Sequence, residues 1–204
     1  MKILLATNNE HKVKEISEIM GPLKKLLVTT SELGEMPDPV EDGSSYRQNA
    51  VKKAMHYYHL TGLPTLADDS GIEIEAFDNE PGIYSSRYLG EDLTYEERNK
   101  KVLEKMKNVP EEKRSACFRC CCVLVLDENN IRTTYGVLEG RISTEPRGEN
   151  GFGYDPIFYL PDRNLNLAEL SQKEKNKISH RAQAFRKMAK EMKKLFKPKI
   201  HVTT

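Results

Sequence analysis

The spacing of apolar residues predicts several strands along the chain. Short apolar runs at residues 2–6 and 25–29 predict two buried strands near the N-terminus. Two longer runs, at residues 116–126 and 131–139, are separated by Glu128-Asn129-Asn130, which suits a tight turn. These two runs therefore predict a long β-hairpin at the centre of a sheet.

Apolar residues at helical spacing, three or four positions apart, mark four further segments. One predicted helix follows Thr7-Asn8-Asn9, a second covers residues 44–60, and a third covers residues 94–107. The last helix carries the apolar stripe Ile178, Ala182, Phe185, Ala189, Met192 and Phe196. Residues 31–42, which are acidic and contain two prolines, are predicted to form a loop.

Two adjacent carboxylates, Asp68 and Asp69, stand in the segment Leu66-Ala67-Asp68-Asp69-Ser70-Gly71, and the strand-like alternation of residues 72–76 follows. Because neighbouring side chains of a strand point to opposite faces, we expect the backbone to bend at Gly71. Paired carboxylates beside a bend suit a hard cation such as magnesium, with one carboxylate free to accept a proton from water. The alternative is an Asp-Ser-Gly turn with exposed acidic side chains.

Residues 7–12, where the first strand leads into a helix, form a second candidate site. Thr7, Asn8 or Asn9 can cap the helix, and Glu10 falls in its first turn. Backbone N–H groups and the helix dipole favour an anion at this point, and Lys12 adds a full positive charge. The alternative is a capped helix without a ligand.

Two later stretches offer groups that recognise a base. In residues 146–158, Phe152 and Tyr154 present flat ring faces, and Asp155 is an acceptor for a base N–H. His180 and Arg181 are donors near the start of the last helix. We also expect Asn49 and Lys53 to point the same way from the helix at residues 44–60, because they are four residues apart. A solvent-facing lysine is the alternative for Lys53.

Composition limits the class of protein. The chain has 204 residues, enough for one domain with a buried core. Acidic and basic residues nearly cancel, leaving a net charge of +1, which argues against a general nucleic-acid binder even though the last helix is rich in lysine. No apolar run reaches the length of a membrane span, so we expect a cytoplasmic protein without a membrane partner.

The four cysteines are bunched at Cys117, Cys120, Cys121 and Cys122, inside one predicted strand. A secreted disulfide framework would spread its cysteines along the chain. Cys117 and Cys120 have the spacing of zinc ligands, but no second pair and no nearby histidine completes a site. We therefore expect free cysteines that pack in the core.

Six short motifs follow one another over nearly the whole chain. They are Thr7-Asn8-Asn9-x-x-Lys12, Glu41-x-Gly43 with Asn49-Ala50 and Lys53-Ala54, Leu66-Ala67-Asp68-Asp69-Ser70-Gly71, Pro81-Gly82-x-Tyr84-Ser85-x-Arg87, Gly151-Phe152-Gly153-Tyr154-Asp155-Pro156 and Lys175-x-x-Ile178-Ser179-His180-Arg181. Each motif is weak alone, but six in this order are specific. Together they resemble the inosine/xanthosine triphosphate pyrophosphatase family.

The resemblance implies an α/β fold in which a long mixed central sheet floors a cleft between two lobes, with helices packed on the sheet. It implies one domain over residues 1–204, a magnesium-dependent enzyme and a homodimer. The reaction that it implies is hydrolysis of a nucleoside triphosphate to the monophosphate and pyrophosphate. The implied substrates are deaminated purine nucleotides, namely ITP, dITP and XTP, which are thereby removed from the nucleotide pool.

The resemblance also implies roles for residues. Asp69 is the expected proton acceptor, and Glu41, Asp68 and Asp69 are the expected Mg²⁺ ligands. The expected substrate-binding residues are Thr7, Asn8, Asn9, Glu10, His11, Lys12, Lys53, Ser70, Phe152, Gly153, Tyr154, Asp155, Lys175, His180 and Arg181.

Base choice separates the family from its alternatives. Donors on His180 and Arg181 suit the keto oxygen of hypoxanthine and xanthine, whereas the amino group of adenine would leave a buried polar group unpaired, at a cost of about 1–3 kcal/mol. A pyrophosphatase of similar fold that acts on modified pyrimidines would differ in this part of the site. A non-catalytic nucleotide-binding module would lack Asp69 or Glu41. Guanine shares the keto oxygen, and the sequence identifies no residue that rejects it.

Overall fold

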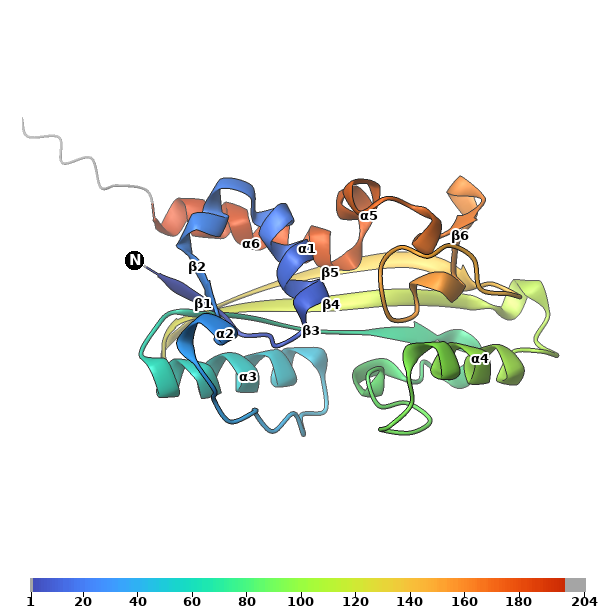
Figure 1. Ribbon diagram of the computed structural model, residues 1–204, viewed down its shortest axis with the longest axis horizontal. Helices are drawn as coiled ribbons and strands as arrows, with labels where there is room; N and C mark the ends of the chain where they lie inside the picture. The colour runs from blue at the N-terminus through green and yellow to red at the C-terminus, as the bar shows by residue number, and fades with distance from the viewer. Residues whose placement is uncertain (1, 197–204) are drawn as a thin grey trace, which may run out of the picture.

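The computed structural model describes residues 2–196, in which one seven-stranded sheet carries helices on both faces (Figure 1). The strands are β1 (Ile3–Leu5), β2 (Leu27–Thr29), β3 (Thr65–Ile74), β4 (Ser115–Asp127), β5 (Asn130–Ile142), β6 (Phe158–Leu160) and β7 (Leu165–Asn166). The α-helices are α1 (Glu10–Met20), α2 (Thr30–Leu33), α3 (Tyr46–Thr61), α4 (Tyr95–Lys105), α5 (Gln172–Ile178) and α6 (His180–Leu195). The predicted α/β class is confirmed.

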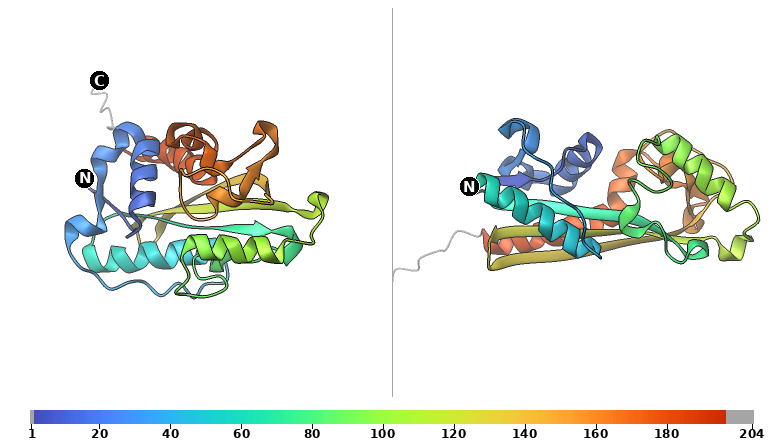
Figure 2. Two further views of the ribbon diagram at one scale, coloured as in Figure 1. Left: turned by 45° about the vertical axis from the view of Figure 1, so that its right-hand side comes forward. Right: turned by 90° about the horizontal axis from the view of Figure 1, so that it is seen from below.

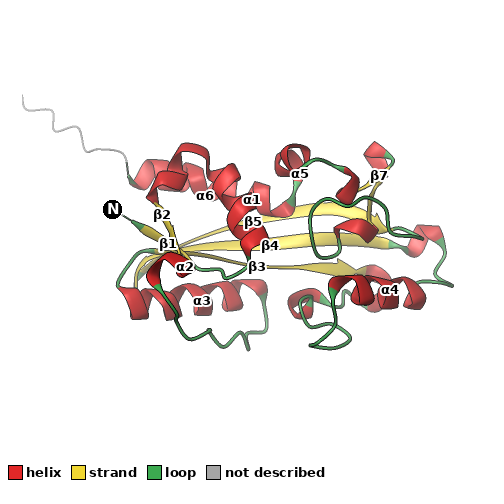
Figure 3. Cartoon of the chain, viewed as in Figure 1, coloured by secondary structure: helices red, strands yellow, loops and turns green. Residues whose placement is uncertain are grey.

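The sheet is mixed, with strand order β2-β1-β3-β4-β5-β6-β7. Strand β1 pairs in parallel with β2 and β3, and the remaining pairs are antiparallel. The predicted hairpin is confirmed as β4 and β5, and β4 is the middle strand of the seven. Figure 3 shows α1, α5 and α6 above the sheet and α3 and α4 below it. No helix within residues 2–196 has the length and apolar character needed to cross a membrane.

Polar side chains cap the starts of three helices. Asn9 accepts a hydrogen bond from Lys12 N at the start of α1, and Ser45 accepts one from Gln48 N at the start of α3. Thr94 caps α4 in a capping box with Glu97. The one-turn helix α2 extends into the predicted loop at residues 31–42. A second capping box, between Thr29 and Glu32, begins this helix.

The predicted last helix is two helices. Ser179 ends α5, and its side chain accepts from Ala182 N to begin α6. Ile178 therefore belongs to α5, while Ala182, Phe185 and Met192 of the predicted stripe are buried between α6 and the sheet. Figure 2 shows α6 running along the long strands. The four cysteines are free, and Cys120, Cys121 and Cys122 are buried in the sheet, as expected.

The bend predicted at Gly71 is wrong. Strand β3 pairs with β4 at every residue, from Thr65 opposite Val125 to Ile74 opposite Ala116. The glycine is needed for a different reason: a Cβ at position 71 would lie 2.2 Å from the carbonyl oxygen of Gly82. The alternation of the strand therefore continues through Asp68 and Asp69, and their side chains point to opposite faces.

Candidate functional site

A cleft of about 710 Å³ lies along the free edge of β3. Strand β1 ends at Leu5, which pairs with Leu66. Beyond Leu66, β3 has no strand partner on that side among residues 2–196 except a single bridge between Glu73 and Pro81. Because the cleft follows an edge, side chains from both faces of the sheet can reach it.

Most of the predicted site residues line this cleft. They are Thr7, Asn8, Asn9, Lys12, Glu41, Lys53, Asp69, Ser70, Phe152, Gly153, Tyr154, Asp155, Lys175, His180 and Arg181. Asp68, Glu10 and His11 are not among the lining residues, and Glu10 lines a neighbouring cavity instead.

Asp69 lies on the α3 side of the sheet, 7% exposed. Its Oδ2 accepts from Asn49 Nδ2 at 3.1 Å, and its Oδ1 accepts from Ser70 N at 2.9 Å. Burial raises the pKa of Asp69 to about 6, although the charges of Lys53 and Lys12 oppose the rise. Asp69 is therefore a carboxylate at neutral pH that is much more basic than an exposed aspartate.

Asp68 lies on the opposite face, fully enclosed. Its Oδ2 accepts from Lys12 Nζ at 3.1 Å and lies 3.4 Å from Arg181 Nε. Burial alone would raise the pKa of Asp68, but Lys12 and Arg181 hold it well below its usual range. Asp68 is therefore a permanent anion that pairs with two cations of the protein and also accepts from the Cys120 thiol.

The expected set of three metal-ligating carboxylates is not assembled. Within residues 2–196, no group of three histidine, cysteine, aspartate or glutamate side chains is placed to hold a metal ion. Asp68 is separated from the other two carboxylates by the sheet, whereas Glu41 and Asp69 both line the cleft. Asp68 is therefore left out of the cation site proposed below, and its predicted role as a metal ligand stays a prediction.

Lys53 joins the segment that carries Glu41 to β3. Its Nζ lies 2.8 Å from Glu41 Oε1 and donates to the carbonyl oxygen of Asp68 at 3.2 Å. Burial lowers the pKa of Lys53, but Glu41 and Asp68 raise it by more, so its charge is retained. The solvent-facing alternative for this lysine is excluded.

The helix end at residues 7–12 has the expected arrangement. Asn8 Nδ2 donates to Asp38 Oδ1 at 3.0 Å, and Asn8 Oδ1 accepts from Thr30 Oγ1. Asn9 caps α1, and Thr7, Asn8, Asn9 and Lys12 at the start of this helix line the cleft. This end of the cleft is suited to a phosphate group.

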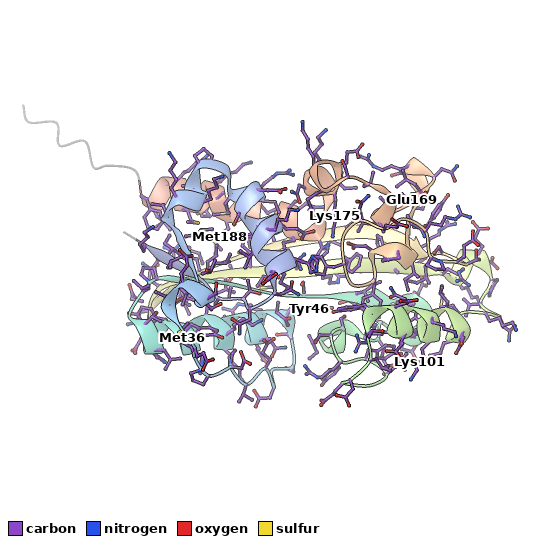
Figure 4. All side chains as sticks on the ribbon, viewed as in Figure 1. Met36, Tyr46, Lys101, Glu169, Lys175 and Met188 are labelled. Carbon is purple, nitrogen blue, oxygen red and sulfur yellow. The ribbon has the colours of Figure 1, made fainter. Side chains whose placement is uncertain are left out.

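A buried glutamate that the sequence analysis missed holds the cations of α5 and α6. Glu15 Oε1 lies 2.8 Å from Lys175 Nζ, and Glu15 Oε2 lies 2.7 Å from Arg181 Nη1. Burial would raise the pKa of Glu15, but Arg181 and Lys175 lower it to about 2. The only sequence signal for it was its position three residues after Lys12 on the same helix. Figure 4 labels Lys175 on α5, above the sheet.

Phe152 lines the cleft, but its ring is covered. The imidazole of His11 lies parallel to it, with the ring centroids 5.2 Å apart, and Lys175 Nζ lies 4.7 Å from its centroid. Asp155 is also engaged, because its Oδ2 accepts from Phe152 N at 2.9 Å and from Lys175 Nζ at 2.5 Å. A base that stacks on Phe152 must therefore enter beside, or displace, one of these groups.

His180 is stacked on Phe118, with ring centroids 4.7 Å apart, and is 4% exposed. Burial holds the pKa of His180 well below its usual value, so the imidazole is neutral and offers one donor and one acceptor. Its Nδ1 has no hydrogen-bond partner within the described part of the chain. A buried polar atom without a partner at the wall of a cleft is a point where a ligand can bind.

The motif at residues 81–87 forms another part of the cleft wall. Ser85 Oγ accepts from Ile72 N at 2.9 Å and donates to Gly82 O, and Tyr154 donates to Ser85 O at 2.7 Å. Tyr154 is thereby fixed as part of the wall, with its ring edge-on to Tyr95. Arg87 also lines the cleft. It was quoted in a motif but given no role.

The Ham1 family profile matches residues 3–191. A dITP/XTP pyrophosphatase of Coxiella burnetii is 44% identical over 191 residues, 93% of this chain and 95% of that protein. One of Dictyoglomus thermophilum is 47% identical over 188 residues, 91% of each chain.

Solved structures of such proteins have the same fold. A HAM1 protein from Coxiella burnetii superposes with a TM-score of 0.86 at 43% identity, covering 95% of this chain and 99% of that one. The Staphylococcus aureus Ham1 protein superposes with a TM-score of 0.85 at 34% identity, covering 96% and 100%.

Proposed function

The chain belongs to the Ham1 family, and from that membership we propose that it is a nucleoside triphosphate pyrophosphatase acting on ITP, dITP and XTP. It would hydrolyse them to the monophosphate and pyrophosphate, which clears deaminated purine nucleotides from the pool. The observation that carries the proposal is Asp69, a carboxylate of raised pKa that lines the cleft and accepts a hydrogen bond from Asn49.

The triphosphate binds at the end of the cleft formed by residues 7–12. Backbone N–H groups at the start of α1 donate to phosphate oxygens, and Lys12 and Lys53 offset their negative charge. Both lysines already have carboxylate or carbonyl partners, so their ammonium groups are held in place before the substrate arrives. Such preorganisation lowers the cost of ordering the site during the reaction.

Asp69 accepts the proton of the attacking water. Its pKa of about 6 leaves it ionised at neutral pH yet basic enough to take a proton. Asn49 and Ser70 N each donate to one of its oxygens and fix the plane of the carboxylate.

Glu41 and Asp69 would hold the Mg²⁺ ion. The donor set fits, because two cleft-lining carboxylates suit a hard cation, and the charge of Glu41 adds to the raised pKa of Asp69. Magnesium commonly takes one or two carboxylates and completes its shell with phosphate oxygens and water, so a third protein ligand is not required. Bound there, the ion would offset the charge of the triphosphate and make a coordinated water more acidic.

The base is selected near His180. His180 and Arg181 both line the cleft, and their N–H groups are the donors assigned to the base. Donors here pair with a keto oxygen, and an adenine amino group leaves them unpaired. Ser70 is held by Arg181 Nη2, which donates to its Oγ at 2.9 Å, and its backbone lies next to Asp69.

The proposal extends to the assembly and place of action. We expect a single domain over residues 1–204 that works as a homodimer. Free nucleoside triphosphates, the substrates of the relatives, are found in the cytoplasm, which supports that location.

Separation of the products from ITP tests the chemistry. We expect IMP and pyrophosphate in equal amounts, with magnesium required. Release of IDP and inorganic phosphate would contradict a pyrophosphatase. Failure to cleave ITP together with turnover of a modified pyrimidine triphosphate would favour the related enzyme class instead.

A further inference from the structure

Two residues of α3, Asn49 and Lys53, make parallel bridges to β3. They are four positions apart, so they lie side by side on the helix. Lys53 links Glu41 Oε1 to the backbone of β3, as described above. Asn49 links the backbone of Gly43 to the side chain of Asp69. Both bridges therefore tie the segment at residues 41–43 to the middle of β3.

The amide of Asn49 can face only one way. Its Oδ1 accepts from Gly43 N at 2.7 Å, and Gly43 N has no acceptor capacity of its own. The Nδ2 group must therefore point the other way, toward Asp69 Oδ2 at 3.1 Å. Asn49 is 1% exposed, so water does not compete for these bonds.

Gly43 is shaped to this contact. A Cβ at position 43 would lie 2.6 Å from Asn49 Oδ1 and 2.8 Å from the Cβ of Gln48. Any side chain at position 43 would push the Asn49 amide away, and Asn49 Oδ1 could then no longer accept from Gly43 N. The segment that carries Glu41 is thus held at a fixed distance from α3.

Asp69 keeps lone pairs that are free to bind a cation or accept a hydrogen bond in the cleft. Each carboxylate oxygen can accept two hydrogen bonds or bind a cation with one lone pair. One site on Oδ2 is taken by Asn49 and one on Oδ1 by Ser70 N. One site on each oxygen remains, and its direction is set by these two donors.

We propose that Asn49 is a positioning residue that sets the spacing of Glu41 and Asp69, so that the two carboxylates bind a divalent cation together. It acts through hydrogen bonds to Gly43 and Asp69 and does not contact substrate. The inference rests on the proposed function, because it needs the two-carboxylate cation site assigned there. Partners of metal-ligating carboxylates typically change metal affinity by about 10- to 100-fold when they are removed.

The test is the binding of Mn²⁺ alone, without nucleotide, measured by titration calorimetry or by electron paramagnetic resonance of the free ion. We expect Asn49→Ala to raise the Kd by about tenfold or more. Gly43→Ala, which disturbs the same bridge from its other end, is expected to act in the same direction. If Asn49→Ala does not fold, Gly43→Ala provides the test in its place.

Gln48→Ala is the matched control. Gln48 is a neighbouring amide on α3 that accepts from Ser44 N at 2.8 Å, so it holds the same segment without reaching Asp69. We expect its Kd for Mn²⁺ to equal that of the unmodified protein. The kcat for ITP in Asn49→Ala should recover as the metal concentration rises, while the KM for ITP at saturating metal stays near that of the unmodified protein.

The outcomes separate this inference from the proposed function. A folded Asn49→Ala and a folded Gly43→Ala that bind Mn²⁺ as tightly as the unmodified protein would overturn the positioning role alone. Mn²⁺ binding that survives Asp69→Asn would overturn the cation site, and the positioning role with it. An equal loss in Gln48→Ala would reduce the effect to general ordering of the segment and would also overturn it.

Discussion

Arg181 Nη1 donates to Glu15 Oε2 across 2.7 Å and joins two residues that are 166 positions apart in the chain. The other carboxylate oxygen of Glu15 pairs with Lys175 Nζ. One buried carboxylate on α1 thus fixes the two cations that α5 and α6 place at the wall of the cleft. Burial alone would lower the pKa of Arg181, but Asp68 and Glu15 raise it, so the guanidinium stays charged.

We expect Glu15→Gln to destabilise the protein in a pH-dependent way. The pKa of Glu15 is lowered from 4.5 to about 2 in the folded protein, so its contribution is present above pH about 4.5 and is lost as the pH falls toward 2. That shift corresponds to about 3 kcal/mol at pH 7. Urea unfolding should show the variant less stable by about this amount at pH 7 and by about half of it at pH 3.

The exposed residue Glu112 supplies the control, because Glu112→Gln should leave the unfolding free energy unchanged at both pH values. A stability difference for Glu15→Gln that is the same at pH 7 and pH 3 would contradict the ion-pair explanation.

Asp69→Asn should abolish turnover while the fold is retained. Asparagine has the same shape but cannot accept the proton, so we expect kcat for ITP to fall by about 10²- to 10⁴-fold. The pH dependence of the unfolding free energy supplies a second measurement. The raised pKa of Asp69 means that its ionisation costs the folded state stability as the pH rises from 3.8 through about 6.

The variant also loses one acceptor for Asn49 Nδ2 or Ser70 N, at a cost that does not depend on pH. In metal-free buffer, the unfolding free energy of the variant relative to the unmodified protein should therefore be higher at pH 7 than at pH 4, by up to about 3 kcal/mol. Near-normal turnover in the variant would exclude Asp69 as the proton acceptor.

Lys53→Ala should weaken catalysis without altering base choice. Lys53 bonds to Glu41 and to the backbone of β3 at the phosphate end of the cleft, so we expect kcat/KM for ITP to fall by about 10- to 100-fold. The ratio of kcat/KM for ITP to that for ATP should stay the same. Lys52→Ala is the control, because Lys52 pairs with Asp42 at the surface and its loss should have no effect. A changed ITP-to-ATP ratio would mean that Lys53 lies near the base.

Gly71→Ala should destabilise the junction between β3 and the segment at residues 81–87. The added Cβ would lie 2.2 Å from Gly82 O and 2.5 Å from Ser85 Oγ, and relief of this overlap costs about 1–3 kcal/mol. Thermal unfolding should report a lower Tm than for Gly62→Ala, in which the new methyl meets no atom within 4 Å and only the positive φ is strained. Equal Tm values for the two variants would argue against close packing at position 71.

The sequence was informative where the signal is local. A cap for α1 was predicted among Thr7, Asn8 and Asn9, because a cap side chain bonds to a backbone N–H two or three residues later, and Asn9 has this role. The two apolar runs on either side of Glu128-Asn129-Asn130 predicted the hairpin, because this short segment suits a tight turn. The motifs then placed most of the cleft-lining residues correctly, since each motif carries its own spacing.

The remaining features depend on contacts between distant parts of the chain. A glycine within an alternating run resembles a bend, and only the approach of Gly82 shows why Gly71 is needed in a straight strand. Asp69 can reach the cleft because β1 stops at Leu5, which no pattern around the aspartates reveals. Glu15 looks like a surface residue of an amphipathic helix until its partners on α5 and α6 are in place.

Release of pyrophosphate from ITP, XTP, dITP, GTP, ATP and dTTP, with magnesium and with EDTA, tests the central claim most directly. We expect rapid release from ITP, XTP and dITP, far slower release from ATP, GTP and dTTP, and none in EDTA. Similar rates on all six nucleotides would contradict base selection by His180 and Arg181. No release from any of them would contradict the assignment of this cleft as a pyrophosphatase site.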